Sequence, residues 1–253
     1  MLAAERKRKI IEYVRLHRSA SVAALAGEFG VHEVTIRRDL AEIEQEGLLK
    51  RTHGGVIVEQ LTRQEASFRE RSHVELDQKR RIGQAAAELV EDGDHILIDS
   101  GTTTLHLAEQ LVNRTHLTVV TNDIQIAAEL RDAPGVKVLV TGGELYPSSN
   151  ILNGMFTDAV LRSVHVSKAF LGIPALHPKR GLMHPDAQLV PAKQGMIAAA
   201  QEVIVLADDT KIGKLSLHQV APMSAVHTLI TGSGASGYDL QTIQEAGVHV
   251  LTV

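Results

Sequence analysis

The sequence predicts two domains: a small helical head with a hairpin in residues 1–57, and an α/β body with a mostly parallel sheet in residues 77–253. Short amphipathic patterns joined by a tight turn fill the first part, whereas later apolar runs alternate with helical patterns of about ten residues. The charge also changes, since residues 1–81 hold 16 Lys and Arg against 13 Asp and Glu, and residues 82–253 hold 10 against 17. A mildly basic head on an acidic body indicates two parts with different partners.

The composition narrows the class of protein. With 253 residues, of which 44% are hydrophobic, the chain can fill a substantial core. The absence of cysteine excludes disulfides, thiolate metal sites and cysteine nucleophiles. No apolar run reaches the roughly 18 residues that span a bilayer, and the N-terminal stretch lacks the apolar segment of a signal peptide. We therefore expect a cytoplasmic protein.

The head is expected to contain three helices. Apolar residues recur at helical spacing over residues 5–18, and Ser21 is expected to cap a second helix that ends at Gly30. The third helix occupies residues 32–47, where Gly47 stops it. Its pattern places Val34, Ile36, Leu40 and Ile43 inward and Thr35, Arg37, Arg38 and Asp39 mostly outward. Two short extended segments around Gly54 and Gly55 follow as a hairpin-like wing. The order predicts a winged helix-turn-helix domain, whose second motif helix enters the major groove of DNA.

The exposed side chains of the head have the chemistry of DNA contacts. Arginine at a helix start can pair with guanine through two hydrogen bonds, threonine can contact a thymine methyl group or a phosphate, and wing cations can neutralise phosphates. The alternative is a small helical domain whose arginines form surface ion pairs with Glu42 and Glu44. The spacing of these residues alone does not decide between the two interpretations.

The segment TIRRDLAEIEQEGLLKRTHGG resembles the signature of the DeoR family of bacterial transcriptional regulators, and the resemblance extends over residues 5–57. In that family TIRRDL opens the recognition helix and RxHGG forms the wing. The resemblance implies that the groove is read by Thr35, Arg37 and Arg38. It implies phosphate contacts by Ser21, Lys50, Arg51 and His53.

Residues 58–76 are expected to be a linker, because they hold few apolar residues and many charges of both signs. The SFRER sequence within them is similar to a short motif that the family keeps between its two domains. In the body, helices are expected at residues 79–93, 102–113, 122–132 and 238–247. Strands are expected at residues 95–99, 117–121, 136–143, 168–173, 202–208, 227–231 and 248–253.

The stretch DSGTTT, residues 99–104, lies where a strand ends and a helix begins. A helix N-terminus presents unpaired N–H groups, Gly101 lets a ligand approach the backbone, and hydroxyl groups add donors without charge, so an anion such as phosphate is favoured. The alternative is that Ser100 or Thr102 merely caps the helix. Asn122 ends the next strand, and Gly142 and Gly143 end the one after it. Small or polar residues at three strand ends imply a shared crevice.

The sequences IDSGTT, TN and GGEL occur in this order in the sensor domain of the DeoR family, and LADDTKIG resembles another of its segments. The resemblance implies a fold related to ribose-5-phosphate isomerase and glucosamine-6-phosphate deaminase, used to sense a phosphorylated sugar. Lys193 and Lys211 are expected to supply positive charge. The expected effector-binding residues are Asp99, Ser100, Gly101, Thr102, Thr103, Thr104, Asn122, Gly142, Gly143, Asp186, Lys193 and Lys211.

Three positions depart from the family pattern. Leu189 stands where the family usually has Glu, Pro174 where it tends to have a small polar residue, and Gly232 where it has Asp. The hydroxyl groups of the effector are therefore expected to be bound differently, and a larger ligand is left open.

Several patterns are discounted as sites. Gly232, Gly234 and Gly237 match a dinucleotide motif, but the chain ends before the acidic residue that such a site needs about 20 positions later. The 13 histidines form no metal-binding motif, and Ser100 lies in no nucleophile elbow. We expect no metal, no cofactor and no catalytic residues.

The sequence therefore predicts a DNA-binding transcriptional regulator, favoured as a repressor of a carbohydrate-catabolism operon, which a phosphorylated sugar releases from its operator. Binding to two half-sites makes a homodimer or homotetramer the expected assembly. One alternative is a sugar-phosphate isomerase or deaminase with an accessory DNA-binding head. Another is a repressor that responds to a partner protein.

Overall fold

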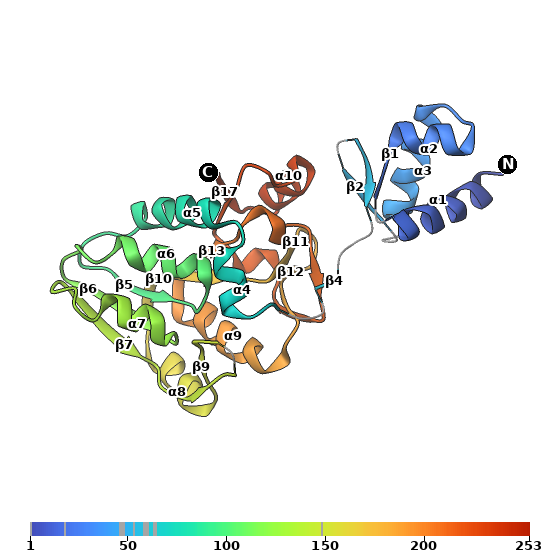
Figure 1. Ribbon diagram of the computed structural model, residues 1–253. Helices are drawn as coiled ribbons and strands as arrows, with labels where there is room; N and C mark the ends of the chain where they lie inside the picture. The colour runs from blue at the N-terminus through green and yellow to red at the C-terminus, as the bar shows by residue number, and fades with distance from the viewer. Residues whose placement is uncertain are drawn as a thin grey trace. The chain divides into compact units, whose positions relative to one another are not determined.

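The computed structural model describes residues 2–17, 19–45, 49–52, 54–57, 61–62, 65–147 and 149–253. These residues group into two compact units, which consist of the first 60 residues and nearly all of the rest (Figure 1). We call them the head and the sensor unit. Among the described helices, none is long and apolar enough to cross a bilayer.

The head has three helices and a small antiparallel sheet with strand order β1-β3-β2. Its elements are α1 (Ala3–His17), β1 (Ser19–Ser21), α2 (Val22–Phe29), α3 (Glu33–Gln45), β2 (Lys50–Thr52) and β3 (Gly55–Ile57). The Ser21 side chain accepts a hydrogen bond from the Ala24 N–H at 3.0 Å, and Gly30 ends α2 in the left-handed conformation. Gly55 lets β3 approach β1, because a Cβ atom there would lie 2.1 Å from the Ala20 carbonyl oxygen.

Two predictions about α3 are wrong. Val34 points outward and is 77% exposed, because it lies two residues before Ile36 and therefore about 200° around the helix from this core residue. Asp39 is buried instead of exposed, since it shares the inner face of α3 with Ile36 and Leu40. Arg6 of α1 compensates for this burial: its Nε donates to Asp39 Oδ2 at 2.6 Å. Gly47, the expected end of the helix, lies outside the described residues.

The sensor unit is built on a seven-stranded sheet in which every neighbouring pair is parallel. All seven strands expected from the sequence are present. In spatial order they are β17 (His249–Thr252), β16 (Thr228–Thr231), β13 (Ala200–Leu206), β10 (Val166–Gly172), β5 (His95–Ile98), β6 (Leu117–Thr121) and β7 (Val136–Val140). The expected α/β domain with a parallel sheet is thus confirmed.

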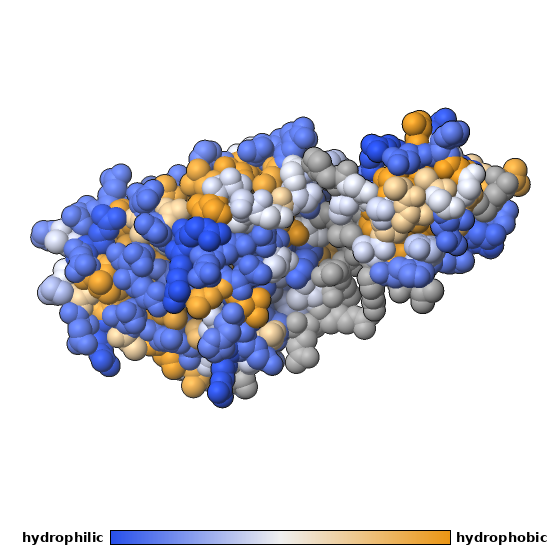
Figure 2. Space-filling view, turned by 45° about the horizontal axis from the view of Figure 1, so that its top comes forward, coloured by the Kyte–Doolittle hydropathy of each residue, from blue (hydrophilic) through white to orange (hydrophobic). Residues whose placement is uncertain are grey.

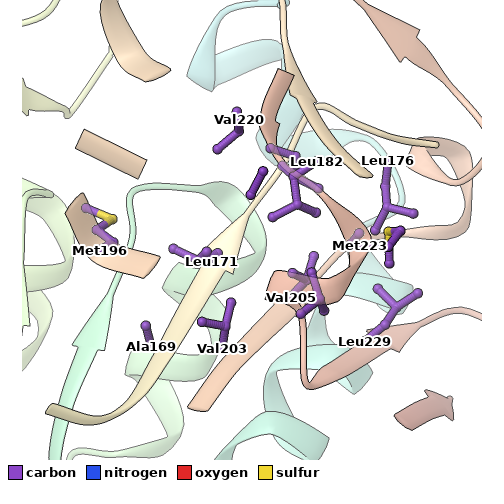
Figure 3. Close-up of a cluster of buried hydrophobic side chains, with 14 of the residues drawn as sticks. Ala169, Leu171, Leu176, Leu182, Met196, Val203, Val205, Val220, Met223 and Leu229 are labelled. Atoms are coloured by element: carbon purple, nitrogen blue, oxygen red, sulfur yellow. The ribbon is translucent and has the colours of Figure 1, made fainter. Parts of the chain in front are cut away.

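Helices cover both faces of this sheet. Successive strand residues point to opposite faces, and the apolar side chains on each face are buried under helices. Ile96 and Ile98 face a core that includes residues of α5 (Leu76–Glu88), α6 (Thr102–Gln110) and α7 (Ile124–Leu130). Leu97 faces the other core, which includes residues of α8 (Met155–Ser163), α9 (Val190–Ala199) and α10 (Gly237–Glu245). Figure 3 shows part of this second core, where side chains of the central strands meet Met196 and Met223.

Shorter strands that the sequence analysis did not predict surround the carboxyl edge of the sheet. One antiparallel sheet contains β11 (Ala175–His177), β12 (Gly181–His184) and β15 (His218–Ala221). Two pairs consist of β8 (Glu144–Leu145) with β9 (Leu152–Asn153) and of β14 (Leu215–Ser216) with β4 (Leu61–Thr62). These additions bring residues from distant parts of the chain to one end of the sheet.

The described part of the expected linker belongs to the sensor unit. Strand β4 pairs with β14, and helix α4 (Phe68–His73) follows with a capping box formed by Ser67 and Glu70. The charges that suggested a solvated segment have partners: the His184 Nε2 atom lies 3.5 Å from Glu65 Oε2. A local sequence pattern does not reveal such a partner, because His184 is more than a hundred residues away.

Candidate effector pocket and DNA-binding face

The pocket lies where the strand order of the parallel sheet reverses. From β5 the chain continues through β6 and β7 toward one edge, whereas β10, β13, β16 and β17 build the other side. Loops leaving the carboxyl ends of β5 and β10 therefore diverge, and such a switch point forms a crevice in open α/β sheets. A hollow of about 40 Å³ that opens toward solvent lies there.

Eight of the twelve predicted effector residues line this hollow. The strand-to-helix turn after β5 supplies five of them, and the ends of β6 and α9 and the turn after β13 supply the rest. They are Asp99, Ser100, Gly101, Thr102, Thr103, Asn122, Lys193 and Lys211. The shared crevice predicted from the strand ends is therefore present, although Gly142 and Gly143 do not line it.

Helix α6 begins at the hollow without a side-chain cap. Its N-cap residue is Gly101, and no side chain of the described residues caps the helix. The Ser100 hydroxyl instead donates to Asp123 Oδ2 at 2.5 Å, and the Thr104 hydroxyl donates to the Gly101 carbonyl oxygen at 3.0 Å. The alternative in which Ser100 or Thr102 caps this helix is thus wrong. Its N-terminus keeps the partial positive charge that attracts anions.

Of the two lysines predicted to bind the effector, Lys193 is the more deeply buried, with 8% of its surface exposed. Its Nζ atom donates to Asp99 Oδ2 at 2.5 Å and to the Gly172 carbonyl oxygen at 2.8 Å. The same Asp99 oxygen accepts the Gly172 N–H at 3.1 Å, which ties β5 to the end of β10. Lys211 lies 3.7 Å from an oxygen of the buried Asp208. An entering anion therefore meets lysines already held in place by carboxylates.

A second polar network fixes the end of β6. The Asn122 side-chain oxygen accepts the Ser100 N–H at 3.2 Å, and its amide donates to the Leu152 carbonyl oxygen at 3.3 Å. Asp123 caps α7 by accepting from the N–H groups of Gln125 and Ile126. Burial raises the pKa of Asp123, although the hydrogen bond from Ser100 opposes this effect. These contacts hold the Ser100 turn against β6.

Four predicted effector residues lie away from the hollow. Thr104 is fully buried behind Gly101. Gly142 and Gly143 have positive φ angles, and a Cβ atom on Gly143 would lie 2.5 Å from the Asn153 carbonyl oxygen, so this glycine permits close packing against β9. Asp186 accepts a hydrogen bond from the Tyr146 hydroxyl in an adjoining hollow, and this bond raises the pKa of Tyr146 to about 12.

Charged residues that the sequence analysis did not select complete the lining. They are Glu65, Arg71, Lys79, His184 and Asp208. Burial alone would raise the pKa of Glu65, but hydrogen bonding to His184 and the charge of Arg71 outweigh it and lower the pKa to about 2. The motif SFRER was the available signal, since Arg71 is its last residue. Together the lining holds four Lys and Arg against three Asp and Glu, a slight excess of positive charge.

The predicted DNA contacts lie on several parts of the head. Arg37 and Arg38 are exposed on α3 and form i,i+4 pairs with Glu33 and Glu42, while Thr35 is half-buried. Exposed pairs of this kind contribute little to stability, so both guanidinium groups are available to DNA. Ser21 is exposed and uses its hydroxyl as the α2 cap, and the Arg51 N–H donates to Glu44. Lys50 lies in β2, and His53 lies outside the described residues.

A family model described as the DeoR C terminal sensor domain matches residues 74–233, and one described as a DeoR-like helix-turn-helix domain matches residues 6–62. The chain belongs to the DeoR family. The DNA-binding head and the effector-sensing domain expected from the sequence are therefore confirmed as domains of a transcriptional regulator.

Curated relatives match nearly the whole chain. The transcriptional regulator YulB of Bacillus subtilis is 34% identical over 100% of this chain and 98% of its own length. A putative aga operon transcriptional repressor of Escherichia coli O157:H7 is 32% identical over 98% and 93%. The repressor GlcR of B. subtilis is 32% identical over 99% and 96%. All three relatives are named as transcriptional regulators or repressors, and this chain is a transcriptional regulator.

Similarity to solved structures is more distant. A probable sor operon regulator of Shigella flexneri shares 13% identity over 72% of this chain and 91% of that chain, with a TM-score of 0.40. Ribose 5-phosphate isomerase A of Neisseria gonorrhoeae shares 15% identity over 55% and 52%, with a TM-score of 0.39.

The departures from the DeoR pattern have different structural settings. Leu189 and Pro174 line the hollow, so a leucine side chain and a proline ring stand where the family has polar groups. Gly232 does not line it, because its backbone packs against the Gln78 side chain, whose oxygen accepts the Asp209 N–H at 2.6 Å. The literal dinucleotide motif forms the turn between β16 and the start of α10. Over the described residues, no group of His, Asp and Glu side chains could hold a metal ion.

Proposed function

We propose that this DeoR-family regulator is a repressor, and that a phosphorylated sugar bound in the sensor hollow weakens its binding to the operator. The function needs no metal or cofactor. The protein would act in the cytoplasm, where it can reach both DNA and metabolites. Two of the relatives are named as repressors, one of them of the aga operon, which supports this direction of regulation.

The uncapped N-terminus of α6 beside Lys193 and Lys211 is the observation that carries the proposal. The helix terminus offers backbone N–H groups and partial positive charge, and the lysines offer full charge. Hydroxyl and amide groups of Ser100, Thr102 and Asn122 surround the same space and can bind the hydroxyl groups of a sugar. A phosphorylated sugar fits this arrangement, because its phosphate group can bind at the positive charges and its hydroxyl groups can bind at the neutral polar groups.

The ligand must bind the form of the protein that releases DNA better than the form that holds it. A tenfold to hundredfold change in operator affinity requires a coupling free energy of about 1.4–2.7 kcal/mol. One charge-assisted hydrogen bond made in only one of the two forms supplies energy of this size.

We further propose a homodimer or homotetramer, since two half-sites on DNA require two heads. Large apolar side chains near the β8–β9 pair support this proposal. Ile124 and Val140 are at least 40% exposed, and three others are more than half exposed. We call this set the α8 patch; it consists of Ile124, Val140, Leu145, Met155 and Phe156. In Figure 2 the visible surface is mainly hydrophilic, and hydrophobic areas are scattered over it.

Fluorescence anisotropy tests the proposal on a duplex taken from upstream of the protein's own gene. The complex is titrated with a panel of sugar phosphates and with their unphosphorylated parents. We expect one phosphorylated sugar to release the duplex and its parent to have a much weaker effect. If no member of the panel changes the affinity for a specifically bound duplex, the proposed effector class is wrong, and a partner protein becomes the alternative.

A further inference from the structure

Two charged residues of the hollow lie outside the stretches that the two family models match. The family models end at residue 62 and begin again at residue 74, yet Glu65 and Arg71 line the hollow between these limits. Glu65 is only eight residues after the end of β3 in the head. The hollow is thus lined partly by the stretch of chain that joins the sensor to the DNA-binding domain.

This stretch is held on the sensor unit by polar contacts. Ser216 Oγ donates to the Thr62 carbonyl oxygen at 2.8 Å beside the β4–β14 pair. Lys79 Nζ, which is buried, donates to the carbonyl oxygens of Arg71 and Val74 at 2.5 and 2.7 Å. Helix α4 itself has no buried residue. An element held by polar contacts and little apolar burial is among the first to rearrange when a charged ligand arrives.

Glu65 and Arg71, which both line the hollow, form an ion pair. Arg71 Nη1 lies 2.9 Å from Glu65 Oε1, and Arg71 Nε donates to the Ala66 carbonyl oxygen at 2.9 Å. The other oxygen of Glu65 lies 3.5 Å from His184. Glu65 is ionised at neutral pH, since its pKa is lowered to about 2. An anion in the hollow attracts Arg71 and repels Glu65, so a ligand can exchange the Arg71–Glu65 pair for an Arg71–ligand pair.

We propose that Arg71 is an effector contact, and that its exchange of Glu65 for the anionic group of the ligand transmits occupancy of the hollow to the DNA-binding head through residues 65–73. This inference rests on the proposed function. A ligand can shift the equilibrium between two conformations only if it binds one of them more tightly. The Arg71–ligand pair, which forms only when the Arg71–Glu65 pair breaks, provides such a difference. The exchange also assigns a role to the SFRER sequence, which neither family model includes.

The test compares Arg71→Gln with Arg69→Gln in the full-length protein. Arg69 is on the same helix but is exposed and absent from the lining, so its variant controls for charge and for helix stability. For each protein, operator affinity is measured without ligand and with saturating amounts of the sugar phosphate that releases the wild type most strongly. Inorganic phosphate is titrated in parallel. Calorimetry gives the affinity of each protein for the same ligand.

We expect Arg69→Gln to behave as the wild type, with operator affinity falling about tenfold or more on ligand addition. Arg71→Gln should bind the ligand about tenfold more weakly, and saturating ligand should change its operator affinity by less than about twofold relative to its own ligand-free value. A variant that still releases the operator fully at saturation would overturn the inference. If Arg71→Gln is unfolded by thermal melting, Arg71→Met, which also removes the charge, replaces it, with the same measurements and the same criterion.

The outcomes separate this inference from the proposed function. If no sugar phosphate releases the operator from the wild type, the proposed function fails. If the wild type responds and both arginine variants respond equally, only the inference fails.

Discussion

At the scale of single residues, the charge of Lys193 has two separate roles that can be measured independently. Lys193→Met removes the cation and leaves the Asp99 carboxylate buried without its ion-pair partner. Breaking a buried pair in this way costs about 3 kcal/mol or more, so urea denaturation should show a large loss of stability in the sensor unit.

Adding Asp99→Asn to Lys193→Met should restore much of this stability, because the uncompensated charge is then gone. The double variant should still fail to respond to a phosphorylated sugar, since its cation is absent. Recovery of the response together with stability would contradict a role for Lys193 in anion binding.

Val34 is a second residue whose setting leads to a prediction. It is highly exposed near the start of α3, three residues before Arg37. An apolar side chain at the start of a recognition helix can contact a thymine methyl group. Val34→Ser should therefore reduce specific operator binding by about 1 kcal/mol while binding to random duplex stays nearly constant. Anisotropy on both duplexes measures the difference, and equal weakening on both would argue against a base contact.

At the scale of elements, the sequence predicts those parts whose pattern is long enough to be unambiguous. The strands of the parallel sheet were predictable because they are apolar or β-rich runs between helical patterns; helices cover both faces of the sheet, so neighbours such as Leu97 and Ile98 are both buried. Strands β4, β8, β9 and β14 have only two residues each, so no period exists to detect. The carboxyl edge of the sheet could thus be predicted as a site, but the strands that close it could not.

The same limit applies to the candidate site itself. The residues after β5 were predictable because strand end, glycine and helix start are adjacent in the chain, and Asn122 follows from the neighbouring strand. Glu65 and His184 were not predictable, since they meet only after β4 and β12 are in place, and SFRER marked Arg71 without showing that it reaches the hollow. The wrong positions of Gly142 and Gly143 have a related cause: glycine at a strand end can serve chain packing as well as ligand access.

The attachment of residues 65–73 to the sensor unit should depend on pH. Because its pKa is lowered on folding, Glu65 stabilises the folded protein above its unfolded pKa of about 4.3, and this contribution disappears as the pH falls through about 2. Glu65→Gln should therefore lower the free energy of unfolding at pH 7, by about 1–2 kcal/mol for this partly exposed carboxylate. In urea titrations the difference between the two proteins should shrink between pH 5 and pH 2. If the difference in free energy of unfolding between the wild type and Glu65→Gln stays constant over this range, ionisation of Glu65 does not stabilise the folded protein.

At the scale of the whole molecule, the charge of the two units fits their separate partners. The part of the chain that contains the head carries the excess of Lys and Arg, whereas the sensor carries the excess of Asp and Glu. A polyanion is therefore attracted to the N-terminal part of the chain and repelled by most of the sensor, whose effector hollow is lined by four Lys and Arg residues. The proposed sugar phosphate and the large DNA would thus bind at different sites on one chain.

The α8 patch gives the last prediction, which concerns assembly. Met155 and Phe156 are 75% and 64% exposed at the start of α8, and large exposed apolar side chains gathered in one patch mark interfaces between subunits. Phe156→Ser should therefore shift the protein toward the monomer in sedimentation velocity, whereas Leu217→Ser, which changes a similarly exposed leucine outside the patch, should not. Since two linked heads bind two half-sites with a high effective concentration, the same variant should lose about tenfold or more in operator affinity while keeping its affinity for a single half-site. A wild-type protein that sediments as a monomer at micromolar concentration would rule out this arrangement, because the patch would then have no second copy to cover it.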